Sequence, residues 1–152
     1  MGSKIRQVSL LDMTLDASVM ASGVIDSARL FNPPVACVNF DTTLWAEAVG
    51  CSVDRSGALP AVESGGSADP NPDLVREAEQ ILILKDAISR VKGALAGYQV
   101  VCAIPGPATL ASHLAIPSPA TKMDQFTVGE LLTEFINILC ESEIDNVLVL
   151  EE

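Results

Sequence analysis

The sequence has few basic residues, few aromatic residues and a single histidine. Its 152 residues include 9 Lys and Arg against 20 Asp and Glu, which gives a formal net charge of −11. Binding to nucleic acid requires a basic face that neutralises phosphates, and anionic membrane surfaces also attract basic segments. The charge balance therefore argues against both nucleic acid and a membrane as partners.

Long apolar runs and clustered cysteines are absent as well. A membrane-spanning helix needs about 20 consecutive apolar residues, and the opening MGSKIRQ lacks the apolar centre of a signal peptide. The cysteines form no CxxC pair and no cluster with the histidine, which argues against zinc; they are Cys37, Cys51, Cys102 and Cys140. We expect reduced cysteines, no metal, no cofactor and a cytoplasmic protein.

Aliphatic residues dominate what is present. Hydrophobic residues make up 49% of the chain and aromatic residues only 4%, so the core must consist mainly of aliphatic and alanine side chains. The length suits one domain with a real core, because domains commonly hold about 100–150 residues.

The stretch from Tyr98 to Leu114, YQVVCAIPGPATLASHL, organises the rest of the chain. It predicts a buried strand over 99–104, a sharp loop at 105–107 and a helix over 108–114. In α/β folds, ligands bind in the loops after strands, and helix N-termini there favour anions. The same pattern also suits a purely structural turn, so both readings stay open.

The other predicted elements follow from hydrophobic spacing and from glycine, proline and capping residues. The first part of the chain predicts a helix over 8–30 that Gly23 can interrupt, a strand at 35–40, and a short helix at 44–49 that 41–43 cap and Gly50 stops. An extended piece at 51–54 and an exposed loop at 55–72 follow, and then a helix at 73–96 that Gly97 stops. After the central strand and helix come a loop at 116–125, a helix opened by the capping-box pair Thr127 and Glu130, and a strand at 146–150. This alternation predicts an α/β fold with a parallel sheet and flanking helices.

The chain ends at Glu152, directly after the last predicted strand. A complete (β/α)₈ barrel typically needs about 250 residues. We therefore expect one truncated domain that forms a partial TIM barrel, with an N-terminal helical segment at 1–34 and βα repeats at 35–152. Open strand edges invite association, so we also expect a homo-oligomer, most simply a two-fold dimer that buries apolar surface from residues 131–150.

Two stretches resemble motifs of the uroporphyrinogen decarboxylase superfamily, which also contains the corrinoid- and coenzyme M-linked methyltransferases. AIPGPATLASHL is similar to the family's GPxTLA loop and helix. NFDTTLWAEAVG, at 39–50, resembles its pattern of a strand end followed by EA-x-G. The runs at 51–54 and 59–62 also fit, and order and spacing agree over roughly residues 35 to 150.

The resemblance implies a catalytic role for Asp41. In the decarboxylases an aspartate lies nine residues before the glycine of the second motif and contacts the pyrrole nitrogens of the substrate, and Asp41 has this spacing from Gly50. Decarboxylation of an acetate side chain passes through a protonated pyrrole, which a fixed carboxylate stabilises. Asp41 also suits a helix cap, and the two roles are compatible.

Further candidate site residues come from the same motifs and from the end of the last predicted strand. Glu151 is a second catalytic candidate, because barrel enzymes place catalytic groups at the carboxyl ends of strands. His113 and Glu47 each have an alternative reading, as a packed histidine and as a structural carboxylate. The substrate-binding candidates are Asn39, Gly106, Pro107, Thr109 and His113.

The chain also departs from both branches of the superfamily. The decarboxylases share an arginine-rich RQAGR stretch that holds substrate carboxylates, whereas here Arg6 and Arg29 are isolated. The methyltransferases carry a His-x-Cys zinc motif, which this sequence lacks. Three functions therefore stay open: decarboxylation of a porphyrinogen or related tetrapyrrole, zinc-dependent methyl transfer from a methyl-donor substrate between a corrinoid protein and a thiol, and a non-catalytic barrel piece that self-associates.

Overall fold

A three-stranded parallel sheet lies at the centre of the structure, a computed structural model that describes residues 10–57, 59–65, 71–115 and 125–151. Its strands are β1 (Val35–Cys37), β4 (Gln99–Pro105) and β5 (Asn146–Leu150), and β4 lies in the middle. Both pairings are parallel. The prediction of a parallel sheet built from these three segments is therefore confirmed.

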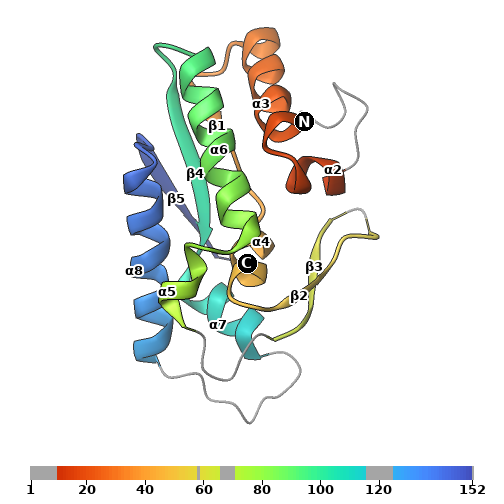
Figure 1. Cartoon of the computed structure of the whole chain (residues 1–152), viewed down its shortest axis with the longest axis vertical. Coiled ribbons are helices and arrows are strands. Elements are labelled where there is room, and N and C mark those ends of the chain that lie inside the picture. The colour runs from red at the N-terminus through yellow and green to blue at the C-terminus, as the bar shows by residue number, and fades with distance from the viewer. Residues whose placement is uncertain (1–9, 58, 66–70, 116–124, 152) are drawn as a thin grey trace.

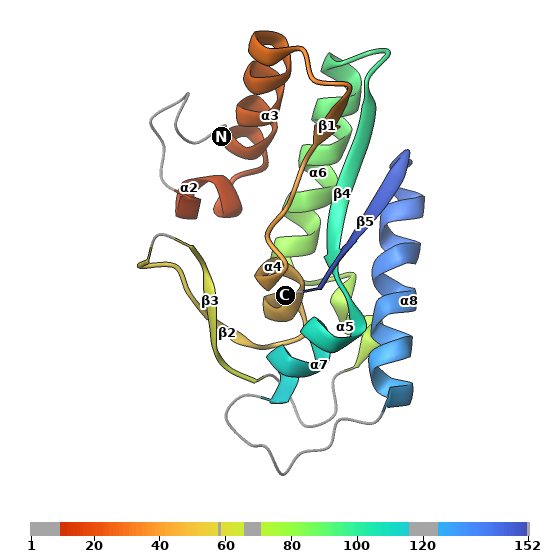
Figure 2. The same ribbon diagram turned by 180° about the vertical axis from the view of Figure 1, so that it is seen from behind.

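The helices lie mainly on one face of this sheet. Figure 1 shows α3 and α6 in front of the strands and α8 beside β5, and Figure 2 shows that no helix of the described residues crosses the opposite face. The helices are α2 (Leu10–Leu15), α3 (Ala17–Phe31), α4 (Thr43–Ala48), α5 (Pro72–Val75), α6 (Glu79–Ala94), α7 (Pro107–Ala115) and α8 (Gln125–Glu141). Within the described ranges, no helix has the length and apolarity needed to cross a membrane.

The core lies between β4 and the helices. Every residue of β4 except Gln99 is buried, as expected for a central strand. Trp45 of α4 is fully buried, and its ring centroid lies 4.6 Å from that of Phe135 in α8. The Trp45 indole N–H also donates to the carbonyl oxygen of Ala103 at 2.8 Å, which joins α4 to β4.

The predicted strand at 35–40 is shorter than expected, because its regular part ends at Cys37. Backbone pairing with β4 nevertheless continues. The Val38 amide donates to the Val101 carbonyl, and the Ala103 amide donates to the Asn39 carbonyl, both at 2.9 Å. The chain therefore stays beside β4 up to the start of the next loop.

The first predicted helix breaks at Asp16, and the prediction of a break near Gly23 is wrong. Asp16 is the N-cap of α3, and its Oδ1 accepts hydrogen bonds from the amides of Ser18 and Val19. Gly23 lies buried inside α3, so it permits close packing without interrupting the helix.

The predicted helix at 73–96 is two helices. The backbone leaves the helix after α5 and becomes extended at Ala78, which is the N-cap of α6. This break changes the phase of the apolar stripe. Leu74 and Leu82, both placed on the buried face by the spacing, are 61% and 53% exposed.

Part of the predicted loop at 55–72 forms a strand. Strands β2 (Ser52–Asp54) and β3 (Ala61–Ser64) form an antiparallel pair. This confirms the predicted extended piece at 51–54 and corrects the predicted loop at 55–72.

The predicted capping box at Thr127 and Glu130 is wrong, because Thr127 lies inside α8 and not at its start. Gly50 and Gly97 follow their helices with φ of 92° and 93°, as expected for stops that need a left-handed backbone. Most of the predicted loop at 116–125 lies outside the described residues.

Candidate functional site

The carboxyl ends of the three parallel strands meet at one end of the sheet, beside α4 and α7 (Figure 1). Asn39 and Asp41 follow β1, the loop at Gly106 follows β4, and Glu151 follows β5. The structure therefore places these predicted site residues at the same end of the sheet. They form two groups with different surroundings.

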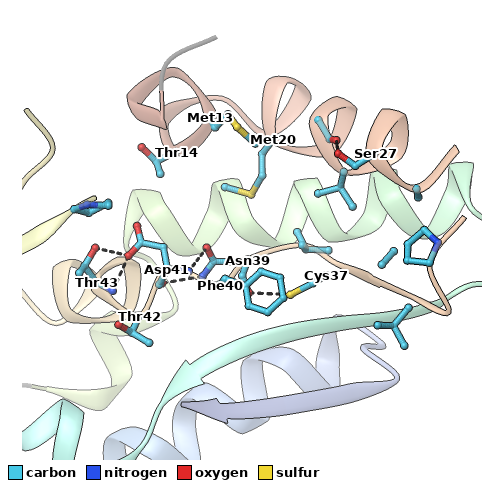
Figure 3. A pocket seen from close by; sticks show the side chains of 18 of the residues that line it. Met13, Thr14, Met20, Ser27, Cys37, Asn39, Phe40, Asp41, Thr42 and Thr43 are labelled. Carbon is cyan, nitrogen blue, oxygen red and sulfur yellow. Dashed lines mark hydrogen bonds between the residues drawn. The ribbon is translucent and has the colours of Figure 1, made fainter. Parts of the chain in front are cut away.

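The first group is a closed set of hydrogen bonds around Asp41 (Figure 3). Asn39 is buried, and its side chain accepts from the Asp41 amide at 3.0 Å and donates to the Asp41 carbonyl at 2.9 Å. Asp41 Oδ1 in turn accepts from the Thr43 amide at 2.9 Å and from the Thr43 hydroxyl at 2.5 Å. Asp41 thus satisfies the first amide of α4, as the capping interpretation requires, and its carboxylate has a fixed orientation.

The other oxygen of this carboxylate has no hydrogen-bond partner among the residues that the structure describes. Asp41 Oδ2 is buried and accepts no hydrogen bond in the part of the chain that the structure describes. Asp41 also lines a cavity of about 610 Å³ between β1 and helices α2 and α3. Figure 3 shows Met20 and Thr14 on the far wall of this cavity, opposite the strand. A buried acceptor beside a cavity can receive an N–H or O–H from a bound molecule.

The second group connects Glu151 to the start of α7. The Glu151 carboxylate accepts from the amides of Ala108 and Thr109, at 3.2 and 2.9 Å, and from the Thr109 hydroxyl at 2.9 Å. The Thr109 amide contributes most to lowering the pKa of Glu151 below its usual value, with smaller contributions from the Ala108 amide and the Thr109 hydroxyl. Glu151 is therefore held as an anion at a helix N-terminus.

Gly106 makes room for this carboxylate. A Cβ at position 106 would lie 2.7 Å from Glu151 Cγ and closer still to its carboxyl group. The Gly106 amide also donates to the Leu150 carbonyl at 2.6 Å. The loop after β4 and the end of β5 thus fit together only with glycine at this position, while Pro107 begins α7.

His113 and Glu47 lie away from the Asp41 cavity. His113 is half-buried in the last turn of α7 and is absent from the cavity lining. Glu47 on α4 forms a two-pronged ion pair with Arg55, with N–O distances of 3.0 and 2.6 Å. This contact supports the reading of Glu47 as a structural carboxylate.

The next question is how the possible metal ligands are placed. Among the described ranges, no three His, Cys, Asp or Glu side chains gather closely enough to hold a metal ion. Burial raises the pKa of Cys37 to about 12, and burial together with the nearby Cys37 raises the pKa of Cys102. Thiolates are the form that binds metals, so these two thiols are poor ligands.

The cavity wall that α2 and α3 provide is not evident from the sequence. Their contribution is a set of apolar and small side chains on the faces turned toward β1. The only earlier signal was the amphipathic spacing of the first helix, which indicates burial without indicating against what. The cavity residues from these helices are Met13, Thr14, Met20, Gly23, Val24, Ser27 and Ala28.

Comparison with known proteins bears on the family and the fold of the chain. Residues 2–148 match the family described as uroporphyrinogen decarboxylase (URO-D). No curated protein gives a significant sequence match. Among solved structures, a methyltransferase from Methanosarcina mazei is similar, with a TM-score of 0.79 and 16% sequence identity.

That structural similarity covers 99% of this chain and 50% of the methyltransferase chain. This chain thus spans about half the length of that protein. The identity is low enough that the similarity concerns the fold, which is α/β and corresponds to part of a TIM barrel. The family match extends over nearly the whole sequence, so the chain belongs to the uroporphyrinogen decarboxylase family.

Proposed function

We propose that Asp41 binds the pyrrole N–H groups of a porphyrinogen-like substrate and stabilises the cation formed during its decarboxylation. The observation that carries this proposal is the state of the Asp41 carboxylate. One oxygen is fixed by Thr43, and the other is buried beside a cavity, with no hydrogen-bond partner among the described residues. A carboxylate oriented before the substrate arrives stabilises developing positive charge without reorganisation.

The walls of the cavity suit a large, mostly apolar molecule. Val35 and Phe40 contribute from the β1 side, and Met20 and Val24 contribute from α3. Such a cavity favours a substrate with an extended apolar surface and a few polar groups, which is the common pattern in small-molecule sites. A tetrapyrrole with central N–H donors has this chemistry.

In this proposal Glu151 is a positioning residue. Its oxygens receive hydrogen bonds from the first turn of α7, so they fix the loop after β4. We assign no proton transfer to the substrate to Glu151. Gly106, Pro107 and Thr109 then act through the shape of this loop, and Asn39 acts through the orientation of Asp41.

The test is CO₂ release from uroporphyrinogen together with binding of coproporphyrinogen, measured for the wild type and Asp41→Asn. Asn retains an oxygen that can accept from Thr43 but removes the charge. We expect turnover to fall by about 10²–10³-fold, as for removal of one fixed electrostatic group. Thr43→Val, which removes only the hydroxyl bond to Asp41, should lower turnover less. Equal activity of wild type and Asp41→Asn would refute the proposal.

A second candidate function is methyl transfer, because the similar solved structure is called a methyltransferase. The described residues offer no cluster for a metal, so we assign no zinc-dependent step to them. Metal analysis of the purified protein, followed by an assay with a methylated corrinoid and a thiol, separates this candidate from the first. Stoichiometric zinc with thiol methylation would favour it.

A further inference from the structure

A second hydrogen-bond acceptor lines the cavity that contains Asp41. Thr14 is 9% exposed and contributes to the cavity lining from the last turn of α2. In Figure 3, Thr14 lies on the α2 side of the cavity and Asp41 lies on the β1 side, toward the same end. The fold thus brings two oxygen-bearing side chains to one end of the cavity from opposite walls.

The hydroxyl group of Thr14 already uses its proton within the chain. It donates to the Leu11 carbonyl oxygen at 2.9 Å, three residues earlier in α2. A hydroxyl has one proton to donate and two lone pairs that accept. With this bond in place, the Thr14 oxygen can accept an N–H or O–H from a bound molecule, and it has no proton left to donate.

Other donors in the cavity lining are also used within the chain. The Ser27 hydroxyl and the Cys37 thiol donate to backbone carbonyl oxygens at 2.7 and 3.2 Å, and the Thr43 hydroxyl donates to Asp41 at 2.5 Å. Burial raises the pKa of Cys37 to about 12, so the thiol keeps its proton and remains a donor to its carbonyl partner. The cavity therefore favours molecules that bring donors to the Asp41 end.

The position of Thr14 is fixed by the junction between α2 and α3. Two residues after it, Asp16 caps α3 and accepts hydrogen bonds from the amides of Ser18 and Val19, at 2.7 and 3.1 Å. The Met20 amide also donates to the Asp16 carbonyl at 2.9 Å. An acceptor that is held in place before the ligand arrives loses little freedom on binding, so more of its hydrogen bond contributes to affinity.

We infer that Thr14 determines specificity, because its hydroxyl oxygen accepts one N–H of the ligand on the side opposite to the N–H that Asp41 accepts. The role of Thr14 rests on the proposed function, since it concerns the same ligand in the same cavity. The ligand must then direct N–H donors to both of its faces. A porphyrinogen can do so because its tetrahedral bridging carbons let each pyrrole ring tilt, whereas a flat, conjugated porphyrin keeps its N–H groups in the ring plane.

The experiment is a calorimetric titration of the full chain with coproporphyrinogen and, separately, with coproporphyrin, without oxygen so that the porphyrinogen stays reduced. The variants are Thr14→Val, which keeps the shape and removes the hydroxyl, Thr14→Ser, which keeps the hydroxyl, and Asp41→Asn. Thr133→Val is the matched control, because the Thr133 hydroxyl donates to the Gly129 carbonyl at 2.8 Å on α8, outside the cavity lining. Urea unfolding without ligand measures the loss of the bond to Leu11 separately.

We expect Thr14→Val to weaken coproporphyrinogen binding about tenfold, since a donor of the ligand is left without its acceptor, and to change coproporphyrin binding by less than about twofold. Thr14→Ser and Thr133→Val should bind both compounds as the wild type does. Equal weakening for both compounds in Thr14→Val overturns the inference, because a merely structural role of Thr14 affects both alike.

The Asp41→Asn variant separates the role of Thr14 from the proposed function. If coproporphyrinogen affinity falls in Asp41→Asn and not in Thr14→Val, the role of Thr14 is overturned and the proposed function stands. If it falls in Thr14→Val and not in Asp41→Asn, Thr14 is an acceptor for the ligand and the proposed role of Asp41 is overturned. A wild type that binds neither compound overturns both.

Discussion

Glu151 and Thr109, 42 positions apart in sequence, are joined by two hydrogen bonds of 2.9 Å, from the Thr109 amide and from its hydroxyl to the same carboxylate oxygen. This contact ties the end of β5 to the first turn of α7. It closes the loop that carries the GPxT motif, so it connects a sequence motif to the arrangement of the strand ends.

The first prediction concerns the pH dependence of this contact. Hydrogen bonds in the folded state lower the pKa of Glu151 below its usual 4.5. A lowered folded-state pKa means that the stabilisation is present above the unfolded-state value and is lost as pH falls through the folded-state value. We expect Glu151→Gln to lose stability relative to wild type at pH 7, and the difference should vanish at strongly acidic pH. Urea unfolding at several pH values measures this difference.

The same contact can be titrated directly. The Glu151 side-chain carbon should show an NMR titration midpoint below 4.5 in the wild type and a midpoint closer to that value in Thr109→Val. Because that substitution keeps the amide donors and removes only the hydroxyl, the pKa should rise only in part. A wild-type midpoint at or above the usual value would contradict the contact.

The second prediction concerns Gly106 and Glu151 together. Gly106→Ala places a methyl group in the space of the Glu151 carboxyl group, so the carboxylate must leave the start of α7. We expect Gly106→Ala to destabilise the wild type and to have almost no effect in a Glu151→Ala background. A double-mutant cycle measured by urea unfolding gives the coupling. Additive effects would mean that the two positions are independent.

The sequence predicted the parts of the fold that depend on local pattern. The uncharged apolar runs that became β1, β4 and β5 indicate parallel strands without reference to distant residues. The expected burial holds only for β4, since Val35 of β1 and Val149 of β5 are exposed. Gly50 and Gly97 mark real helix stops because only a residue without a Cβ adopts their φ readily. The position of Asp41 at the carboxyl end of a strand followed from the same local reading.

Other features depend on contacts between distant segments, which periodicity does not reveal. The break between α5 and α6 lies where Arg76 forms ion pairs with Glu134 and Glu141 of α8. The second oxygen of Asp41 borders a cavity that α2 and α3 close, and local spacing does not reveal this contact. The role of Glu151 requires Gly106 and Thr109, which lie more than 40 positions earlier in the chain.

The third prediction concerns the orientation of Asp41. Asn39 is 7% exposed and makes hydrogen bonds to both backbone groups of Asp41. We expect Asn39→Ala to cost about 1–3 kcal/mol of stability because it leaves buried polar groups without partners. Substrate binding should weaken as well, although the charge at Asp41 is unchanged. Urea unfolding and coproporphyrinogen titration measure the two effects, and stable protein with unchanged binding would show that Asn39 does not orient the site.

The fourth prediction concerns the aromatic pair in the core. Phe135 is fully buried, and its ring lies 4.6 Å from that of Trp45. Phe135→Ala should cost about 3–5 kcal/mol, as is usual for loss of a buried aromatic ring. Phe135→Leu, which keeps most of the volume, should cost less than about 1.5 kcal/mol. Trp45 is the only tryptophan, so its fluorescence reports both unfolding curves. Equal costs for the two variants would mean that the ring does not fill a rigid core site.

The last prediction tests whether Glu47 is structural. Its ion pair with Arg55 joins α4 to the end of β2, and the two side chains are only 24% and 9% exposed, with Arg55 the more buried. Breaking a buried pair by removing one charge is costly, because the other charge stays buried without compensation, whereas exposed pairs contribute little. We therefore expect Glu47→Gln to destabilise the protein by about 2–4 kcal/mol. Replacing both residues, as in Glu47→Leu with Arg55→Leu, should recover much of this loss since no charge remains unpaired.

Turnover per folded molecule should stay unchanged in Glu47→Gln, because the cavity beside Asp41 does not include Glu47. Urea unfolding and the CO₂ assay at a temperature where all variants are folded separate the two roles. A loss of turnover without a loss of stability would place Glu47 in the chemistry after all.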